Sequence, residues 1–195
     1  THRPRRGSRG FSPRVRSKRH YPRIDSWPSI SDKRLLGFAG YKAGMTQIVF
    51  IDNSSVSPTK GETVSLPVTI IDVPKIRVAA IRFYSSDKRF FKKAKTEIWT
   101  DKLDKDLYRK LPLMKKKKHI EEELKKVEHD INEISDVTVL VYTLPKGRVG
   151  KKKPEIFEVA IGGKDIHEKL MYAKEILGKE LGVKDLVKPG EQVDV

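Results

Sequence analysis

The sequence predicts a mainly β fold: a small barrel or sandwich of short strands, with a large inserted α+β segment and a disordered basic N-terminal extension. Short runs rich in β-branched and aromatic residues follow one another over residues 35–84. From residue 85 onward, helical periodicity is mixed with further strand patterns. Residues 1–23 carry nine Lys or Arg and no Asp or Glu. We therefore expect four segments: extension and linker (1–34), first barrel strands (35–84), an inserted α+β region (85–183) and a return to the barrel (184–195).

The composition points to an anionic partner. The chain has 195 residues, of which 35% are charged, and its formal net charge is +16. Such a surplus favours nucleic acid or an acidic membrane surface. A membrane-surface role needs a basic amphipathic helix, and the basic N-terminus is too rich in Pro and Gly to form one. No apolar stretch approaches the roughly 18 residues that span a bilayer. The absence of cysteine excludes disulfides, thiolate zinc sites and cysteine nucleophiles.

The basic extension, residues 1–23, is expected to be disordered on its own, because its charges repel one another and it has little apolar mass. Five Pro or Gly residues argue against a regular helix. Against RNA, the same charges release condensed counterions, and arginine can grip a phosphate with two hydrogen bonds or stack on a base. Phe11, His20 and Tyr21 could stack on exposed bases. A solvated tail or a localisation signal is the alternative.

The stretch Leu35–Asp52 is predicted to form the central hairpin. Its halves Leu36–Ala43 and Met45–Asp52 read as strands, and Gly44 stands where a tight reversal would use a positive φ. The unbroken apolar character of the second half is typical of a strand covered on both faces. In the linker, Trp27 is expected to pack the extension against the domain rather than to stack on a base.

Two further strands complete this region. Residues 64–70 alternate apolar and polar side chains, which predicts a half-buried strand. Pro67 cannot donate to a ladder, so this strand lies at an edge or carries a bulge. Pro74 ends it, and Ile76–Tyr84 is the next strand.

The first half of the inserted region mixes short elements with basic runs. We expect a short strand at Thr96–Thr100 and a short helix at Leu103–Leu111. An amphipathic helix should begin at His119, since apolar residues recur at steps of four and three. Its stripe comprises Ile120, Leu124, Val127, Ile131 and Ile134. The four lysines at 115–118 precede this helix, where its dipole disfavours them, so phosphate contact or simple solvation accounts for them.

The second half is predicted to contain strands at Asp136–Leu144 and Ile156–Gly162, separated by the acid-free basic loop Lys146–Pro154. A helix should follow with Asp165 as N-cap and Glu168 completing a capping box. Its buried stripe would be Ile166, Leu170, Ala173 and Leu177. Finally, Glu191–Val195 reads as the beginning of a strand, from which we expect an unfinished barrel and a longer protein.

No catalytic or metal-binding constellation stands out. None of the five histidines pairs at metal-ligand spacing, and Met171 stands where a zincin motif starting at His167 would need its second histidine. The Gly162-Gly163-Lys164 sequence lacks the spacing of a nucleotide-binding loop, which leaves a helix cap or, more weakly, contact with one RNA phosphate.

Several motifs resemble one family, in the same order along nearly the whole chain. They are the basic extension, Ser26-Trp27-Pro28, GFAGYKAGMT (37–46), VTIIDVP (68–74), TEIWTD (96–101), KKKPEIFE (151–158) and PGEQVDV (189–195). Together they resemble the large-subunit ribosomal protein L-three family in its archaeal and eukaryotic form, and GYKAGMT is the most specific. The resemblance implies that this chain is the N-terminal part of a longer protein. In members of the family, the chain continues past PGEQVDV into a long basic loop and then completes the barrel.

The resemblance also implies a translation-factor-like (reductase/elongation-factor-like) β-barrel with a large insertion, and basic extensions that thread into ribosomal RNA. It implies a structural constituent of the large subunit of the cytoplasmic ribosome that helps fold the RNA during assembly and supports translation. The implied partners are large-subunit ribosomal RNA, near its 3′ domain, and neighbouring large-subunit proteins. No enzyme activity, cofactor, metal, membrane or small-molecule substrate is implied.

We expect RNA to be bound by cations of the extension and of the protruding loops. They are Arg3, Arg5, Arg6, Arg9, Arg14, Arg16, Lys18, Arg19, Arg23, Lys42, Lys88, Arg89, Lys92, Lys93, Lys115, Lys116, Lys117, Lys118, Lys146, Arg148, Lys151, Lys152 and Lys153. Phosphate contacts would fix position, and RNA shape would supply specificity. A free-standing RNA-binding translation or regulatory factor with a small β-barrel is the alternative, and an RNA-modifying enzyme is disfavoured by the missing catalytic constellation.

Overall fold

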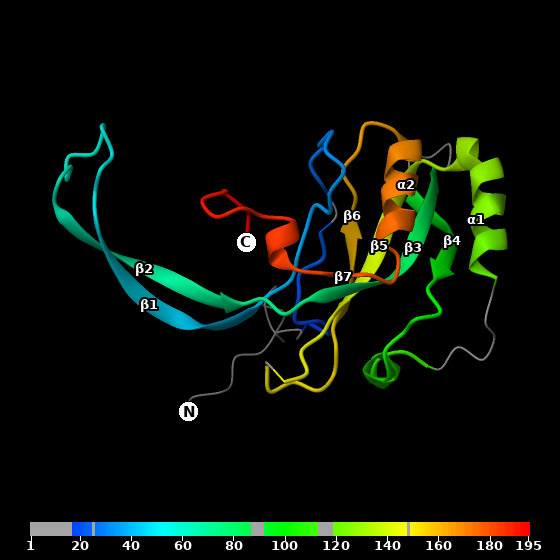
Figure 1. Cartoon of the computed structure of the whole chain (residues 1–195), viewed down its shortest axis with the longest axis horizontal. Coiled ribbons are helices and arrows are strands. Elements are labelled where there is room, and N and C mark those ends of the chain that lie inside the picture. Colours follow the sequence, from blue (N-terminus) through cyan, green and yellow to red (C-terminus); the bar gives the residue numbers. More distant parts are fainter. Residues whose placement is uncertain (1–16, 25, 87–91, 113–118, 148) are drawn as a thin grey trace, which may run out of the picture.

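The computed structural model describes residues 17–24, 26–86, 92–112, 119–147 and 149–195. A long two-stranded ribbon projects from a sheet that two helices cover on one face (Figure 1). The ribbon consists of β1 (Tyr41–Ile51) and β2 (Thr63–Asp72). The sheet contains β3 (Ile76–Ser86), β4 (Lys92–Trp99), β5 (Asp136–Thr143), β6 (Ile156–Ala160) and β7 (Glu180–Leu181). The prediction of a mainly β fold is confirmed.

The five-stranded sheet is antiparallel in every pairing, with the order β4-β3-β5-β6. The short β7 pairs with the first residues of β3. Strand β5 lies between β3 and β6 and is buried along almost its whole length, as its run of valines and aromatics predicts. The strands expected at 76–84, 136–144 and 156–162 are therefore all present.

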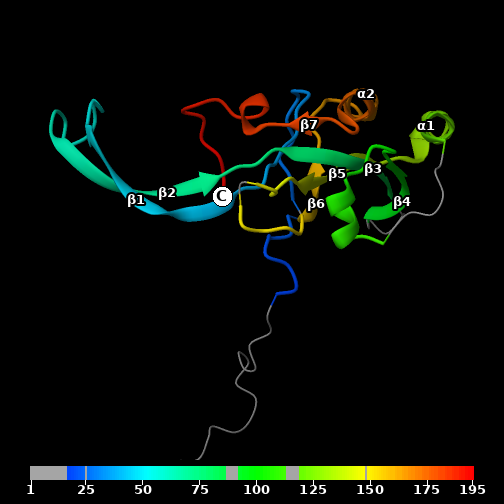
Figure 2. The ribbon, with the colours of Figure 1, turned by 60° about the horizontal axis from the view of Figure 1, so that its bottom comes forward.

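The helices α1 (Ile120–His129) and α2 (Ile166–Ile176) cover one face of this sheet (Figure 2). The main core lies between them and the sheet, and includes the fully buried side chains of Ile81, Val139 and Ala173. A smaller cluster around Leu107 and Tyr142 lies beneath the 3₁₀ helix η1 (Lys105–Arg109), which occupies the position of the expected short helix. Two further 3₁₀ turns are η2 (Ile131–Glu133) and η3 (Val183–Asp185).

The expected hairpin turn at Gly44 is wrong. Strand β1 runs through Gly44 without reversing, and only a register shift between Lys42 and Gly44 marks the glycine. The reversal lies at residues 52–62, where Asp52 accepts hydrogen bonds from the Ser54 amide (2.9 Å) and the Thr59 hydroxyl (2.8 Å). Gly61, with φ of 84°, closes this turn. Hydrogen-bond acceptors at a short polar loop outweigh an isolated glycine as a turn signal.

The prediction that β1 is covered on both faces is also wrong. Met45, Val49 and Ile51 each expose more than 60% of their surface, and Leu66 and Ile70 on β2 are about half exposed. Among the described residues, β1 and β2 pair only with each other. Pro67 lies opposite Gln47 in this ribbon, as expected of a strand at a sheet edge.

Three smaller expectations change as well. Helix α1 ends at His129, although Ile131 and Ile134 still pack on the core. Asp165 makes no side-chain capping bond, and Glu168 accepts instead from the amide of Lys164 at 3.2 Å. Residues 191–195 form no strand, and no strand within the described residues pairs with them.

The linker of residues 26–36 is held against the domain by close packing at two glycines. Trp27 packs on the core, and its ring lies where a side chain on Gly37 would stand, about 2.8 Å from an ideal Cβ. This confirms Trp27 as a packing anchor. At Gly162, an ideal Cβ would come within 2.4 Å of the Asp32 carbonyl oxygen. Both glycines therefore allow the linker to approach β6 and the residues after it.

Asp136 links β5 to both neighbouring layers. Its carboxylate accepts from Lys92 on β4 at 2.9 Å and from Lys169 on α2 at 3.0 Å. Burial alone would raise the pKa of Asp136, but these two hydrogen bonds outweigh it and hold the pKa below its ordinary value of 3.8. A carboxylate with a depressed folded-state pKa stabilises the fold above the unfolded pKa, and this contribution is lost as the pH falls through the folded pKa.

We expect Asp136→Asn to lower the free energy of unfolding by about 1–2 kcal/mol at pH 7, because two charge-assisted hydrogen bonds lose their anion. Urea denaturation at a series of pH values measures the deficit. It should shrink as the pH falls below about 4, where the carboxylate of the unfolded chain takes up a proton, and vanish once the pH has passed the depressed folded-state pKa. A deficit that stays constant down to about pH 2 would show that packing, not charge, accounts for the effect.

Candidate RNA-binding surface

Many cations of the folded domain are already neutralised by acids. Arg82 on β3 pairs with Glu97 on β4 (2.7 Å) and with Glu158 on β6 (2.5 Å). Desolvation opposes its charge, but the hydrogen bonds and these two carboxylates raise the pKa of Arg82 further above neutrality. Arg77 pairs in the same way with Asp104 at 2.7 Å. Such pairs belong to the structure of the sheet, so the surplus of positive charge lies elsewhere.

The described end of the basic extension is docked by one aromatic residue. The Tyr21 hydroxyl donates to the carbonyl oxygen of Ile156, and its ring lies 5.7 Å from that of Phe157. Tyr21 is therefore engaged by β6, and the expectation that it stacks on a base is not supported. Lys18 and Arg19 remain exposed, with the Arg19 guanidinium 6.0 Å from the Tyr21 ring. Tyr21 thus fixes the described end of the extension at the start of β6.

The acid-free loop 146–153 leads directly into that same strand. Lys152 and Lys153 are exposed and form no ion pair within the described parts of the chain. Lys151 pairs with Glu155, and its ammonium lies 5.9 Å from the centre of the Tyr41 ring. Since Glu155 adjoins Ile156, the structure brings two basic segments together that are about 130 residues apart in sequence.

Glu155 joins the loop to η1. It is 91% buried, and its carboxylate accepts from Lys110, at 2.6 Å, and from Lys151. Its own amide donates to the Thr143 hydroxyl at 3.1 Å. Burial would raise the pKa of Glu155, but the two lysines outweigh it and lower the pKa below its usual range. The carboxylate therefore stays charged at neutral pH and fixes the two segments relative to each other.

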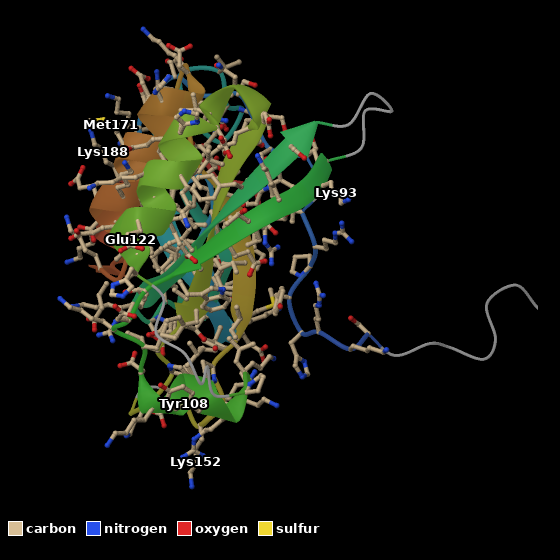
Figure 3. The ribbon with its side chains drawn as sticks, turned by 90° about the vertical axis from the view of Figure 1, so that its right-hand side faces the viewer. Lys93, Tyr108, Glu122, Lys152, Met171 and Lys188 are labelled. Carbon is tan, nitrogen blue, oxygen red and sulfur yellow. The ribbon has the colours of Figure 1, made fainter. Side chains whose placement is uncertain are left out.

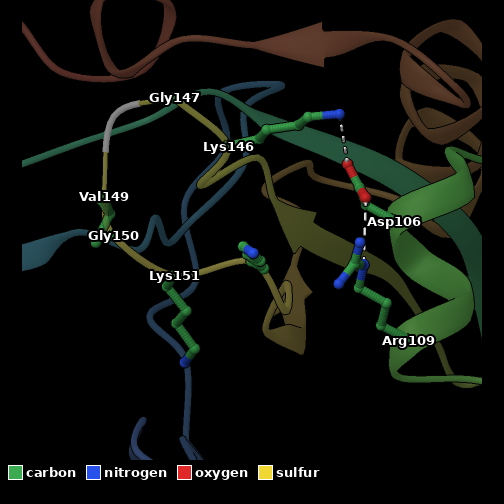
Figure 4. A pocket seen from close by; sticks show the side chains of 8 residues that line it. Asp106, Arg109, Lys146, Gly147, Val149, Gly150 and Lys151 are labelled. Carbon is green, nitrogen blue, oxygen red and sulfur yellow. Dashed lines mark ion pairs between the residues drawn. The ribbon is translucent and has the colours of Figure 1, made fainter.

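Between η1 and this loop lies a cavity of about 460 Å³, which we call the basic pocket. It is lined by Asp106, Arg109, Lys146, Gly147, Val149, Gly150, Lys151 and Lys152. Figure 4 shows Asp106 between Arg109, with Nε 3.4 Å from Oδ1, and Lys146, with Nζ 3.7 Å from Oδ2. Four cations and one carboxylate give the lining a formal charge of +3.

Lys92 and Lys93 do not join the surface of the basic pocket. Lys93 lies at the far end of the sheet from Lys152 (Figure 3), paired in register with Ser85. Lys92, expected to meet RNA, is bonded to Asp136. Lys42 is exposed at the start of the ribbon, next to Tyr41.

The Gly162-Gly163-Lys164 turn is a structural cap rather than a phosphate site. The amide of Gly162 donates to Arg34 and that of Gly163 to Ile30, both at 2.8 Å. The amide of Lys164 donates to Glu168. The donors that a phosphate would need are thus already used by the linker and by α2.

Many of the expected contact residues lie outside the described residues, so they stay predictions. They are Arg3, Arg5, Arg6, Arg9, Arg14, Arg16, Lys88, Arg89, Lys115, Lys116, Lys117, Lys118 and Arg148. Sequence reasoning missed Arg109, because nothing local indicates that η1 faces a loop 40 residues later. Within the described ranges, no cluster of His, Asp or Glu could hold a metal ion. No helix in those ranges is both long and apolar enough to cross a bilayer.

Comparison with known proteins identifies the family. A family described as Ribosomal protein L3 matches residues 1–195. The chain is 49% identical to the large ribosomal subunit protein uL3 of Methanocaldococcus jannaschii, over 98% of the chain and 57% of that protein. It is 45% identical to uL3 of Methanococcoides burtonii, over 100% of the chain and 58% of that protein. The chain thus spans somewhat more than half the length of these relatives. On this evidence, the chain belongs to the ribosomal protein L3 family.

Proposed function

We propose that this protein is a structural constituent of the large ribosomal subunit, where it binds ribosomal RNA and helps to fold and stabilise it during assembly. Its relatives carry the name of a large-subunit protein. In this role it is not an enzyme and works in the ribosome, in contact with large-subunit RNA near the 3′ domain and with neighbouring ribosomal proteins.

The observation that carries this proposal is the separation of charge in the chain. The sheet pairs its own cations with acids, as Arg82 does with Glu97 and Glu158. Residues 1–23, in contrast, supply nine positive charges and no negative ones, out of a net charge of +16. Tyr21 bonds to Ile156, and the neighbouring Glu155 pairs with Lys151 of the loop, which supports a basic surface formed at the start of β6. A basic surface whose cations outnumber its acids is what a polyanion requires.

The proposal also covers the β-barrel and the insertion expected from the sequence. We propose that β1 and β2 form part of a translation-factor-like barrel and that residues 85–183 are an insertion in it. The exposed apolar side chains of the ribbon support this assignment, because an isolated two-stranded ribbon is marginally stable in water.

Sedimentation of ribosomal particles tests the proposed function. Full-length protein carrying an affinity tag, expressed in its own cells, should co-sediment with large subunits through a sucrose gradient. It should stay there after a high-salt wash, because RNA contacts buried in a folded particle exchange slowly. Recovery only from the free protein at the top of the gradient would contradict the proposal and favour a regulatory factor.

A further inference from the structure

We propose that the basic pocket between η1 and the loop 146–152 binds a phosphodiester group of RNA. This inference rests on the proposed function and names a place in the described domain where several cations surround a cavity. The pocket combines an excess of cations, walls tied together by hydrogen bonds and open space at Gly150.

The charge of the pocket is free to act on a ligand. Asp106 is the lone acid in the lining, and its two ion pairs are long, at 3.4 Å to Arg109 and 3.7 Å to Lys146. The side chains of Arg109 and Lys146 are 54% and 82% exposed. Exposed pairs of this length contribute little stability. The carboxylate therefore lies between the two cations and offsets only part of their charge. With Lys151 paired to Glu155, the positive charge available to a ligand comes from Arg109, Lys146 and Lys152.

Hydrogen bonds and packing tie together the described residues of the pocket walls. Glu155 ties the loop to the segment after η1 through Lys151 and Lys110. Within the loop, the Val149 amide donates to the Pro145 carbonyl at 3.0 Å, and the Lys151 amide to the Val149 carbonyl at 2.6 Å. Leu107, almost fully buried, anchors η1 on the sheet. A preformed site loses less conformational entropy when it binds.

Gly150 leaves open space at the edge of the basic pocket. An ideal Cβ at this position meets no atom within 4 Å, and its φ lies outside the region that favours glycine. Neither packing nor backbone conformation in the described protein therefore requires a glycine here. Gly147, in contrast, has φ of 81° and is explained by the turn. We infer that Gly150 leaves the room through which a sugar–phosphate backbone approaches the cations.

The binding experiment measures how two pairs of charge-removing substitutions in the 195-residue chain change its affinity for deproteinised large-subunit ribosomal RNA. Arg109→Gln with Lys152→Gln removes two pocket cations. Each lost phosphate contact should reduce the salt slope by about 0.9, so the pair should weaken binding about 60-fold at about 0.1 M salt. The matched control is Lys33→Gln with Lys174→Gln, which removes the same charge from sites paired with Glu168 and Glu128.

Gly150→Val adds a test that does not change charge. We expect unchanged thermal unfolding, because the new side chain meets open space, and about tenfold weaker RNA binding, because it enters the approach path. If the pocket pair and the control pair weaken binding equally and Gly150→Val has no effect, the pocket proposal is wrong while the proposed function stands. If the intact chain fails to bind the RNA at all, the proposed function itself fails.

Amide NMR shifts distinguish the RNA backbone from a free anion. In the proposal, a short RNA duplex shifts the amide signals of Gly147 and Gly150 in a saturable way, and the Arg109→Gln, Lys152→Gln variant loses this response. Inorganic phosphate should shift them only at much higher concentrations. Signals that respond to inorganic phosphate but not to RNA, or to neither, would overturn the assignment.

Discussion

Removing residues 1–16 is expected to weaken binding to large-subunit ribosomal RNA by about 10³-fold or more at about 0.1 M salt. The deletion takes away six arginines and no acid, and it leaves Tyr21 in place to hold the remaining linker on β6. Each cation that neutralises an RNA phosphate releases condensed counterions, which is the main source of affinity in such complexes. Equilibrium binding at constant ionic strength measures the loss.

A matched control separates this effect from a general loss of charge. Replacing cations that pair with acids in the folded domain, such as Lys95 with Glu133 at 2.5 Å, changes the net charge but removes no expected contact. These variants should bind within a few-fold of the intact chain. Equal losses in the deletion and in a control of the same charge would show that the extension makes no specific contribution.

Gly162→Ala is expected to have the largest effect on stability. Its Cβ would lie 2.4 Å from the Asp32 carbonyl oxygen, which is backbone and cannot rotate away. The linker must then withdraw, and the hydrogen bonds from the Gly162 amide to Arg34 and from the Gly163 amide to Ile30 are lost. We expect the free energy of unfolding to fall by about 2–4 kcal/mol. Urea denaturation followed by circular dichroism measures the change.

Gly44→Ala is the control for this substitution. Gly44 lies within β1 with no atom within 4 Å of its ideal Cβ and with no positive φ. Alanine there should leave stability unchanged or raise it by up to about 1 kcal/mol, because it restricts the unfolded chain. If Gly162→Ala were as mild as Gly44→Ala, the linker would not be held at this point, and the extension would lack a fixed exit from the domain.

The sequence predicted the elements that bury a continuous face. The strand predicted at residues 136–144 is observed as β5 (Asp136–Thr143), because a run of valines favours a strand that is buried on both faces of a layered sheet. The apolar positions at steps of three and four in α1 and α2 lie on the core side, even where α1 ends early at His129. Trp27 was also predicted correctly, because a lone tryptophan before a domain has few other places to be buried.

The sequence could not show whether an apolar strand is buried or exposed in the fold. Residues 45–52 are as apolar as β5, yet they lie in an exposed ribbon, because burial depends on what else packs there. A turn was predicted at Gly44, but a glycine within a strand can equally mark a local shift in the pairing register, as it does here. The basic pocket escaped prediction for a similar reason. Arg109 and Lys152 meet only because the Leu107 cluster and Glu155 bring η1 beneath the loop.

The salt dependence of RNA binding by the intact chain tests most directly whether its surplus cations face phosphates. With seven to nine phosphates of duplex RNA neutralised by the extension alone, the logarithm of the association constant should fall with the logarithm of salt concentration at a slope of about −6 to −8. A slope near zero, with the chain bound and folded, would contradict the account.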